Sequence, residues 1–273
     1  MLICHDILCI SKNLAASALC YNCICKCEQY AYNVNYVCLW LASLGIAAYE
    51  ADIFKNEPNM TEEAKILKGQ LFCPGDHELK AMKRRSHDLS AQYSRTSEGD
   101  VELRARLAQE ILAAFGEGSF MQGPVFFHYG KHTRIGLRNF INYNFTVQDD
   151  ALVTIGNDNN FGPNVTIVTP CHPILPDERR TMLNENGEPK HLCYAKPVTI
   201  GNDCWFGANV VICPGVTIGD NCVIGAGSVV THDIPANSVA VGVPCRVLRT
   251  ISEADSMVNF PEILGPNHVI PTK

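Results

Sequence analysis

Residues 198–230 read VTIGNDCWFGANVVICPGVTIGDNCVIGAGSVV, and every sixth residue of this stretch is aliphatic or aromatic. These positions are Ile200, Phe206, Ile212, Ile218, Ile224 and Val230. The same spacing occurs earlier in the chain, at Ile135, Ile141 and Val147 and again at Ile155, Phe161 and Ile167. Glycine often follows the apolar residue. A six-residue period of this kind is typical of a parallel β-helix.

The repeat also predicts where function can lie. Three hexapeptides form one triangular coil, whose inward residues stack on their counterparts in the next coil, and the ends of the stack need caps. This architecture has no concave pocket of its own. We therefore expect an active site in a groove between coils or in a loop that interrupts the repeat. One interruption, from Ile167 to Ile200, is too long for a turn and contains His172.

The chain divides into four parts by sequence pattern. Residues 1–59 form an atypical Cys-rich extension that we expect to be poorly ordered, and Met60 reads like a natural start. Residues 60–118 read as a helical cap. Residues 119–250 carry the hexapeptide repeats, with an inserted loop at 168–199, and residues 251–273 read as a tail.

Two helices are expected within the cap. Thr61 is a suitable N-cap for the first helix. Asp100 precedes the second, and we expect Gly116 to end it. The apolar face of this second helix consists of Leu103, Leu107, Ile111 and Leu112.

Composition excludes several classes of function. The net charge of −6 gives no basic field for nucleic acid. The apolar run 37–49 is shorter than the roughly 20 residues that span a bilayer, so no membrane partner is expected. Of the 14 cysteines, seven lie in the first 38 residues and the others are scattered singly, which favours a reducing, cytoplasmic location.

A cysteine motif in the extension raises the question of a metal. Cys20, Cys23, Cys25 and Cys27 form C-x2-C-x-C-x-C, and four thiolates are able to bind a soft metal. However, no second Cys/His pair stands at finger-like spacing. We therefore expect no metal.

Several stretches together point to a known family. Residues 60–72 read MTEEAKILKGQLF, residues 126–136 FFHYGKHTRIG, residues 142–150 NYNFTVQDD and residues 168–173 VTPCHP. With the repeats, they resemble the maltose/galactoside O-acetyltransferase family. The resemblance implies a mainly β fold, a left-handed parallel β-helix with an N-terminal helical cap. It also implies acetyl-CoA as co-substrate, a small hydroxylated acceptor, and a homotrimer with sites between subunits.

The resemblance assigns roles to individual residues. His172 matches the family's catalytic histidine, a general base that takes the proton of the attacking hydroxyl. Asn142 and Asp150 match positions that contact the acceptor, and an amide and a carboxylate each suit vicinal hydroxyls. The positions matched on the CoA side are Trp205, Ala208, Ala226, Thr231, His232, Arg246 and Arg249. The backbone N–H of Ala208 is the expected oxyanion donor, and the two arginines suit phosphates.

The chain departs from the family pattern mainly on the acceptor side. Cys73 stands where the family usually has Asp, with Asp76 as a possible substitute. His128 replaces an Asp or Ser, and Cys193 replaces a Glu or Met. On the CoA side, His232 replaces a lysine. The loop is also longer around 179–191, so the resemblance does not identify the acceptor.

Alternatives remain open at this point. The leading hypothesis is direct acetyl transfer to a sugar hydroxyl in a ternary complex, because no Ser or Cys nucleophile stands in a base-paired motif. A second hypothesis is acetyl transfer to the hydroxyl of an acceptor that is not a sugar. A zinc enzyme like the γ-type carbonic anhydrases needs three converging histidines. The candidates His128, His132, His172 and His191 lack that family's spacing. A silent β-helix scaffold is the third class.

Overall fold

The computed structural model describes residues 60–183 and 186–266. The extension 1–59, with its expected disorder and its cysteine motif, lies outside these residues. In the described part, no helix is long and apolar enough to cross a membrane.

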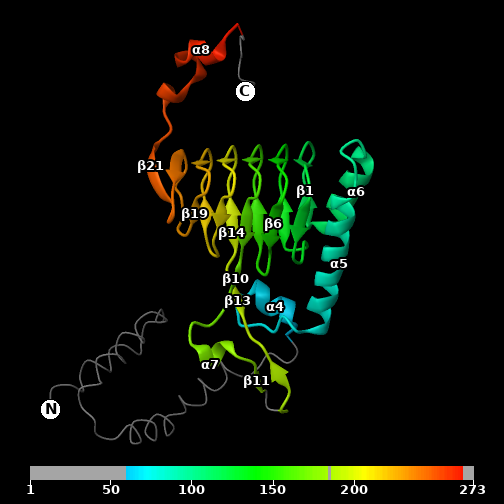
Figure 1. Ribbon diagram of the computed structural model, residues 1–273. Helices are drawn as coiled ribbons and strands as arrows, with labels where there is room; N and C mark the ends of the chain where they lie inside the picture. The colour runs from blue at the N-terminus through cyan, green and yellow to red at the C-terminus, as the bar shows by residue number, and fades with distance from the viewer. Residues whose placement is uncertain (1–59, 184–185, 267–273) are drawn as a thin grey trace, which may run out of the picture. The chain divides into compact units, whose positions relative to one another are not determined.

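Three sheets, parallel except for the last strand of the second sheet, form the three faces of a stacked triangular coil (Figure 1). The first sheet contains β1 (Ala114–Phe115), β4 (Thr133–Ile135), β7 (Val153–Ile155), β14 (Val198–Ile200) and β17 (Thr217–Ile218). The second contains β2 (Phe120–Met121), β5 (Phe140–Ile141), β8 (Asn160–Phe161), β15 (Trp205–Phe206), β18 (Val223–Ile224), β20 (Ser238–Val241) and β21 (Arg246–Thr250). The third contains β3 (Val125–Phe127), β6 (Phe145–Gln148), β9 (Thr166–Val168), β16 (Val211–Ile212) and β19 (Val229–Val230). The predicted fold class is confirmed.

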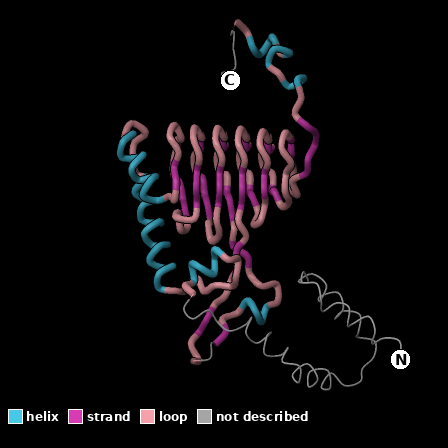
Figure 2. The backbone as a smooth tube through the Cα atoms, turned by 180° about the vertical axis from the view of Figure 1, so that it is seen from behind, coloured by secondary structure: helices cyan, strands magenta, loops and turns pink. Residues whose placement is uncertain are grey.

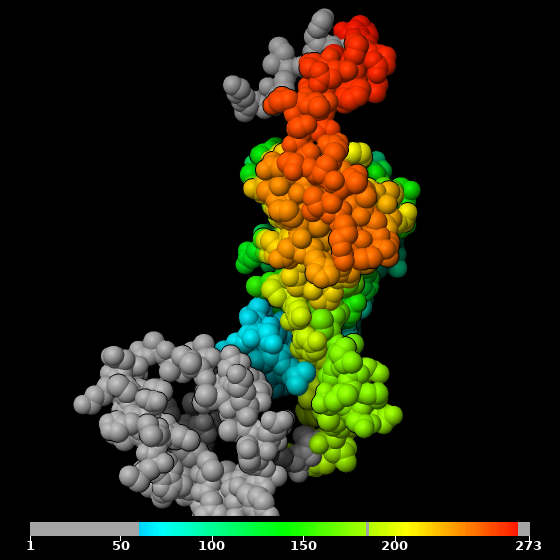
Figure 3. Space-filling model, turned by 90° about the vertical axis from the view of Figure 1, so that its left-hand side faces the viewer, coloured from blue at the N-terminus to red at the C-terminus, as the bar shows by residue number. Residues whose placement is uncertain are grey.

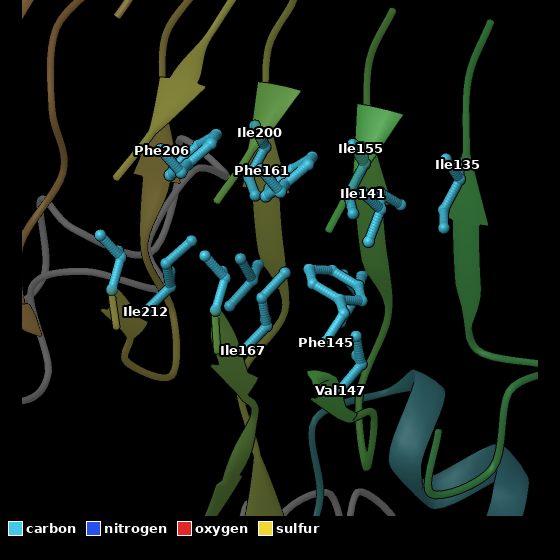
Figure 4. Close-up of a cluster of buried hydrophobic side chains, with 14 of the residues drawn as sticks. Ile135, Ile141, Phe145, Val147, Ile155, Phe161, Ile167, Ile200, Phe206 and Ile212 are labelled. Atoms are coloured by element: carbon cyan, nitrogen blue, oxygen red, sulfur yellow. The ribbon is translucent and has the colours of Figure 1, made fainter. Parts of the chain in front are cut away.

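The residues of the six-residue period form the core (Figure 4). In the first sheet Ile135, Ile155 and Ile200 are direct partners of one another in successive coils. Aromatic rings fill the middle of the prism. Phe161 stacks on Phe206 with centroids 4.6 Å apart and planes 2° apart, and its other neighbour, Phe145, lies at 5.3 Å.

The corners between faces depend on small or left-handed residues. A Cβ on Gly156 would lie 2.5 Å from the carbonyl oxygen of Gly201, which no real side chain tolerates. At another corner Asn144, Asn164 and Asn209 have φ of 59–60°, the left-handed region that asparagine accepts. Their side-chain amides hydrogen-bond to one another at 2.9 and 3.1 Å, which links three coils.

The helical cap consists of α4 (Glu62–Leu67), α5 (His77–Ser94) and α6 (Val101–Ile111). Helices α5 and α6 cover the β1 end of the stack, and α4 lies below the coils, near the start of the inserted loop (Figure 1). Thr61 is the N-cap of α4, since its Oγ1 accepts from the Ala64 N–H at 3.1 Å. Asp100 precedes α6 as expected, although its carboxylate accepts from Ser97 N–H rather than from the helix.

The prediction that the helix after Asp100 ends at Gly116 is wrong. Helix α6 ends at Ile111, and Gly116 lies just after β1 at the first corner of the coil. A Cβ there would be 2.2 Å from the carbonyl oxygen of Gly136. This glycine is therefore required by coil stacking, and the coil begins at residue 114 rather than 119.

A buried arginine joins the cap to the first coil. Arg104 donates to the carbonyl oxygens of Met121 and Gln122, and its guanidinium lies over the rings of Tyr93 and Phe120. At 5 % exposure it has no carboxylate partner among the described residues. Carbonyl dipoles and ring faces thus stabilise its charge.

The inserted loop projects from the coil between β9 and β14 (Figure 2). Its two legs, β10 (Pro170–Cys171) and β13 (Tyr194–Ala195), pair antiparallel. Beyond them lie α7 (Pro176–Arg179) and the pair β11 (Met182–Leu183) and β12 (Pro189–Lys190).

The other end of the stack is closed by β21, which pairs antiparallel with β20. Figure 3 looks onto this end, where these strands form much of the surface (orange). The tail continues in short helical turns at Glu253–Asp255, Met257–Asn259 and α8 (Pro261–Leu264).

Phe161→Ala tests the aromatic stack. Removing a buried phenylalanine leaves a cavity and should lower the free energy of unfolding by about 3–5 kcal/mol in urea titrations. The control is Phe140→Ala in the same sheet, where the side chain is 38 % exposed and the loss should be clearly smaller. Equal losses would contradict the proposed core.

Candidate active site

Two corners of the coil carry the predicted site residues. The loop corner follows the strands of the third sheet and holds His128, Asp150 and the inserted loop with His172. The groove corner follows the strands of the second sheet and holds Asn142, Gly162, Ala208 and Ala226.

Two adjacent aspartates at the loop corner have different surroundings. The carboxylate of Asp149 accepts from the Tyr129 N–H at 2.7 Å and from the Thr133 hydroxyl at 2.8 Å. It therefore holds the corner together. In Asp150, Oδ1 lies 4.0 Å from His128 Nε2, and the buried Oδ2 has no hydrogen-bond partner within the described residues. Only Asp150 is available to a ligand.

Burial shifts the pKa values of two groups at this corner. Desolvation, followed by the charge of Asp149, raises the pKa of Asp150 to about 6. Desolvation, followed by the charge of Lys83, lowers the pKa of His128 to about 4. At neutral pH His128 is therefore an uncharged imidazole that exchanges hydrogen bonds rather than a cation paired with Asp150.

The cap contributes to the same corner through the segment before α5. The backbone of Phe72 exchanges hydrogen bonds with that of Cys193, at 2.9 and 3.1 Å. Cys193 is 2 % exposed, and burial together with Asp150 raises its pKa to about 12, so it presents a neutral thiol. The carboxylate of Asp76, the possible substitute at the Cys73 position, instead caps α5 by accepting from Glu78 and Leu79 N–H groups.

The predicted base lies on the loop, directly after β10. His172 is exposed, and its ring centroid is 5.6 Å from that of His191 on the returning leg. Its neighbour Cys171 is close enough to Cys193 to affect the pKa of that thiol. The loop that carries His172 thus begins at the corner that holds Asp150.

The groove corner has the features expected for a thioester ligand. A groove of about 450 Å³ lies beside Asn142 and Trp205, and the indole is 58 % exposed. Further along the corner, the backbone N–H groups of Ala208 and Ala226 have no hydrogen-bond partner in the described part of the chain. Both are free to donate to a carbonyl oxygen.

The remaining CoA-side residues lie toward the β21 end. Thr231 and His232 are at the loop corner of the last coil, with Thr231 Oγ1 2.9 Å from His232 Nδ1. Arg246 lines a hollow with His232. Arg249 forms a two-point ion pair with Asp255, at 2.8 and 2.6 Å, so a phosphate would compete with that carboxylate.

One chain does not bring the two corners together. The four-residue strand β6 separates them, which is about 13 Å at 3.3 Å per residue. Among the described residues, no group of three His, Cys, Asp or Glu side chains is arranged to hold a metal ion.

Sequence reasoning missed two residues at the loop corner. Tyr129 is 1 % exposed, and its ring centroid lies 4.7 Å from that of His128. The ring centroid of His87, on α5, lies 5.5 Å from that of His128. Tyr129 directly follows His128 in the stretch FFHYGKHTRIG, so the sequence could have marked it as a candidate. No sequence signal marks His87, because its position depends on how α5 packs on β3.

Asp150→Asn tests the burial of this carboxylate. The folded protein holds the Asp150 proton more tightly than the unfolded chain, so ionisation costs stability as the pH rises from about 4 to about 6. The variant does not titrate. Its free energy of unfolding relative to the natural chain should therefore rise across this window, by up to about 3 kcal/mol.

The measurement is urea unfolding at several pH values between 4 and 7. Asp158→Asn is the control with the opposite sign, because Arg138 lowers the pKa of this exposed carboxyl. A difference between Asp150→Asn and the natural chain that does not change with pH would contradict the buried state.

Comparisons with known proteins identify the family of this chain. Residues 65–116 match the maltose acetyltransferase hexapeptide capping motif, and residues 197–232 match the hexapeptide repeat of succinyl-transferase. The galactoside O-acetyltransferase of Escherichia coli (strain K12) is 42 % identical over 204 residues, covering 75 % of this chain and 96 % of the relative. That of Lactococcus lactis is 37 % identical, covering 72 % and 92 %.

Solved structures extend the likeness to the fold. A galactoside acetyltransferase in complex with coenzyme A matches with a TM-score of 0.65 and 42 % identity, over 72 % of this chain and 94 % of that one. A maltose O-acetyltransferase from Clostridium difficile 630 matches with a TM-score of 0.64 and 37 % identity, over 71 % and 99 %. The chain therefore belongs to the maltose/galactoside O-acetyltransferase family of hexapeptide-repeat proteins.

Proposed function

We propose that this protein transfers acetyl from acetyl-CoA to a hydroxyl of a sugar or similar polyol, with His172 as general base. Membership of the family makes the chain an acetyl-CoA-dependent O-acetyltransferase. The single observation that supports the finer proposal is the loop corner, where a buried Asp150 oxygen has no hydrogen-bond partner among the described residues and where the loop that carries the exposed His172 begins.

The chemistry assigned to these residues is direct transfer. His172 accepts the proton of the acceptor hydroxyl while the oxygen of that hydroxyl attacks the thioester carbonyl. The new carbon–oxygen bond forms and the carbon–sulfur bond breaks, with the proton passing from His172 to the departing CoA thiolate. The acceptor leaves as an O-acetyl ester and CoA as a thiol.

Two further groups support this step. The free N–H of Ala208 suits the oxyanion that develops on the thioester oxygen, and a preorganised donor of this kind typically contributes about 3–4 kcal/mol. Asp150 and Asn142 are assigned to acceptor hydroxyls. Trp205 is assigned to the CoA chain, and Arg246 and Arg249 to its phosphates.

We further propose a homotrimer with each site shared between subunits. The loop corner of one chain and the groove corner of the same chain are separated by a strand, so the base and the donor groove meet only when a second copy supplies one of them. A cytoplasmic location is proposed as well. It agrees with the seven described cysteines, which are all unbridged.

His172→Ala tests the assigned base. Loss of a general base should lower kcat by about 10²–10⁴-fold while acetyl-CoA binding, measured by calorimetry, stays nearly unchanged. The control is His77→Ala, an exposed histidine at the start of α5. Transfer at the normal rate by His172→Ala would place the base elsewhere.

Mixing variants tests the shared site. His172→Ala and Asn142→Ala should each be impaired alone. If the two side chains come from different subunits, refolding equal amounts together restores about a quarter of the sites by random assortment. Activity of the mixture no greater than the average of the two variants would show that one chain supplies both residues.

A further inference from the structure

Buried side-chain polar atoms without a hydrogen-bond partner are confined to one place in the described residues. Three buried side-chain atoms have no hydrogen-bond partner there: His87 Nε2, the Tyr129 hydroxyl and Asp150 Oδ2. They come from three separate elements, helix α5 and the corners after β3 and β6. All three residues nevertheless surround one side chain.

The shared neighbour is His128. Its ring lies 5.5 Å from the His87 ring and 4.7 Å, edge to face, from the Tyr129 ring. Its Nε2 is 4.0 Å from Asp150 Oδ1. The charge of Asp150 also contributes, after burial, to raising the pKa of Tyr129. The three atoms therefore all belong to neighbours of His128 at the loop corner.

Neighbouring buried groups show that such atoms are normally satisfied here. Ser86, one residue before His87, donates to the Phe127 carbonyl at 2.8 Å. His132 Nδ1 is 2.9 Å from the Asp149 carbonyl oxygen, and both Asp149 oxygens are bonded. An unsatisfied buried group costs about 1–3 kcal/mol, so three together form an unfavourable arrangement unless a ligand completes it.

We propose that His87 and Tyr129 are specificity-determining residues that, with Asp150, bind two adjacent hydroxyl groups of the acceptor. The inference rests on the proposed function, since it places the acceptor of acetyl transfer at the loop corner. It adds the helical cap, through His87, to the acceptor site.

Hydrogen-bonding capacity favours a vicinal diol over a single hydroxyl. One hydroxyl donates to the Asp150 carboxylate and accepts from the Tyr129 hydroxyl. The adjacent hydroxyl bonds to His87 Nε2, which is a donor or an acceptor according to tautomer. Burial and Lys83 lower the pKa of His87, so it is a neutral partner. A monohydric alcohol leaves at least one of the three atoms unsatisfied.

Tyr129→Phe is the most direct test, because it removes only an oxygen that has no partner in the protein. Its Tm should stay the same or rise. In assays of CoA release, KM for glucose, maltose or methyl β-galactoside should rise about 5–10-fold, the value of one hydrogen bond, while KM for acetyl-CoA stays unchanged. His87→Phe should raise the KM for the sugars to a similar extent. Both substitutions should raise the KM for butan-1-ol less than the KM for the sugars.

Tyr93→Phe is the matched control. The Tyr93 hydroxyl is bonded to the Met121 carbonyl at 2.6 Å and to Arg104. Its loss should lower Tm and leave the KM of the acceptor unchanged, the reverse of Tyr129→Phe.

Two results would overturn the inference. If the natural protein acetylates a sugar but Tyr129→Phe has a lower Tm and an unchanged acceptor KM, the hydroxyl has a structural role and only the proposed function stands. If the natural protein transfers acetyl to none of these acceptors, the proposed function fails and the inference fails with it.

Discussion

Backbone pairing between successive coils is the constraint on which the rest of this structure depends. Each strand hydrogen-bonds to the same face of the coils before and after it, so equivalent residues lie directly above one another. Inward positions must then be apolar and mutually complementary, as Phe161 and Phe206 are. Corner positions must tolerate a close backbone, as Gly156 does against Gly201. The period of six follows from satisfying both demands on three faces.

This regularity decides where chemistry is possible. The faces are occupied by pairing, so functional groups are left to the corners and to the one loop that departs from the stack. At the groove corner the turn leaves the N–H groups of Ala208 and Ala226 free. At the loop corner the chain buries Asp150 and starts the loop that carries His172. The rigid stack fixes these two sets of groups but keeps them on different edges of the prism.

The loop corner offers polar groups whose ionisation is shifted by burial. Burial holds His128 uncharged, raises the pKa of Asp150 to about 6 and keeps Cys193 a neutral thiol. Hydrogen bonds made in such a buried site are costly to lose. His128 and Cys193, where the chain departs from the family pattern, change which hydrogen bonds this corner offers. Under the proposed function these groups would meet the acceptor, and the groove corner would hold the thioester.

Local patterns in the sequence were sufficient for the fold and for the place of the interrupting loop. The inward residues, the long interruption and the Thr61 cap could be predicted because each depends on neighbours along the chain. Gly116 was assigned to a helix end because its true partner, Gly136, lies on the next coil. The different roles of Asp149 and Asp150 and the presence of His87 at the loop corner depend on packing between α5 and the coil, which no local pattern encodes.

The central claim is that this protein moves acetyl from acetyl-CoA to a hydroxyl group. Its most direct measurement follows free CoA thiol with acetyl-CoA and a panel of sugars and simple alcohols, with mass spectrometry of the products. The account predicts release of CoA that depends on a polyhydroxylated acceptor and equals the amount of O-acetyl ester formed. Folded protein that binds acetyl-CoA but forms no ester with any hydroxylated acceptor would contradict it.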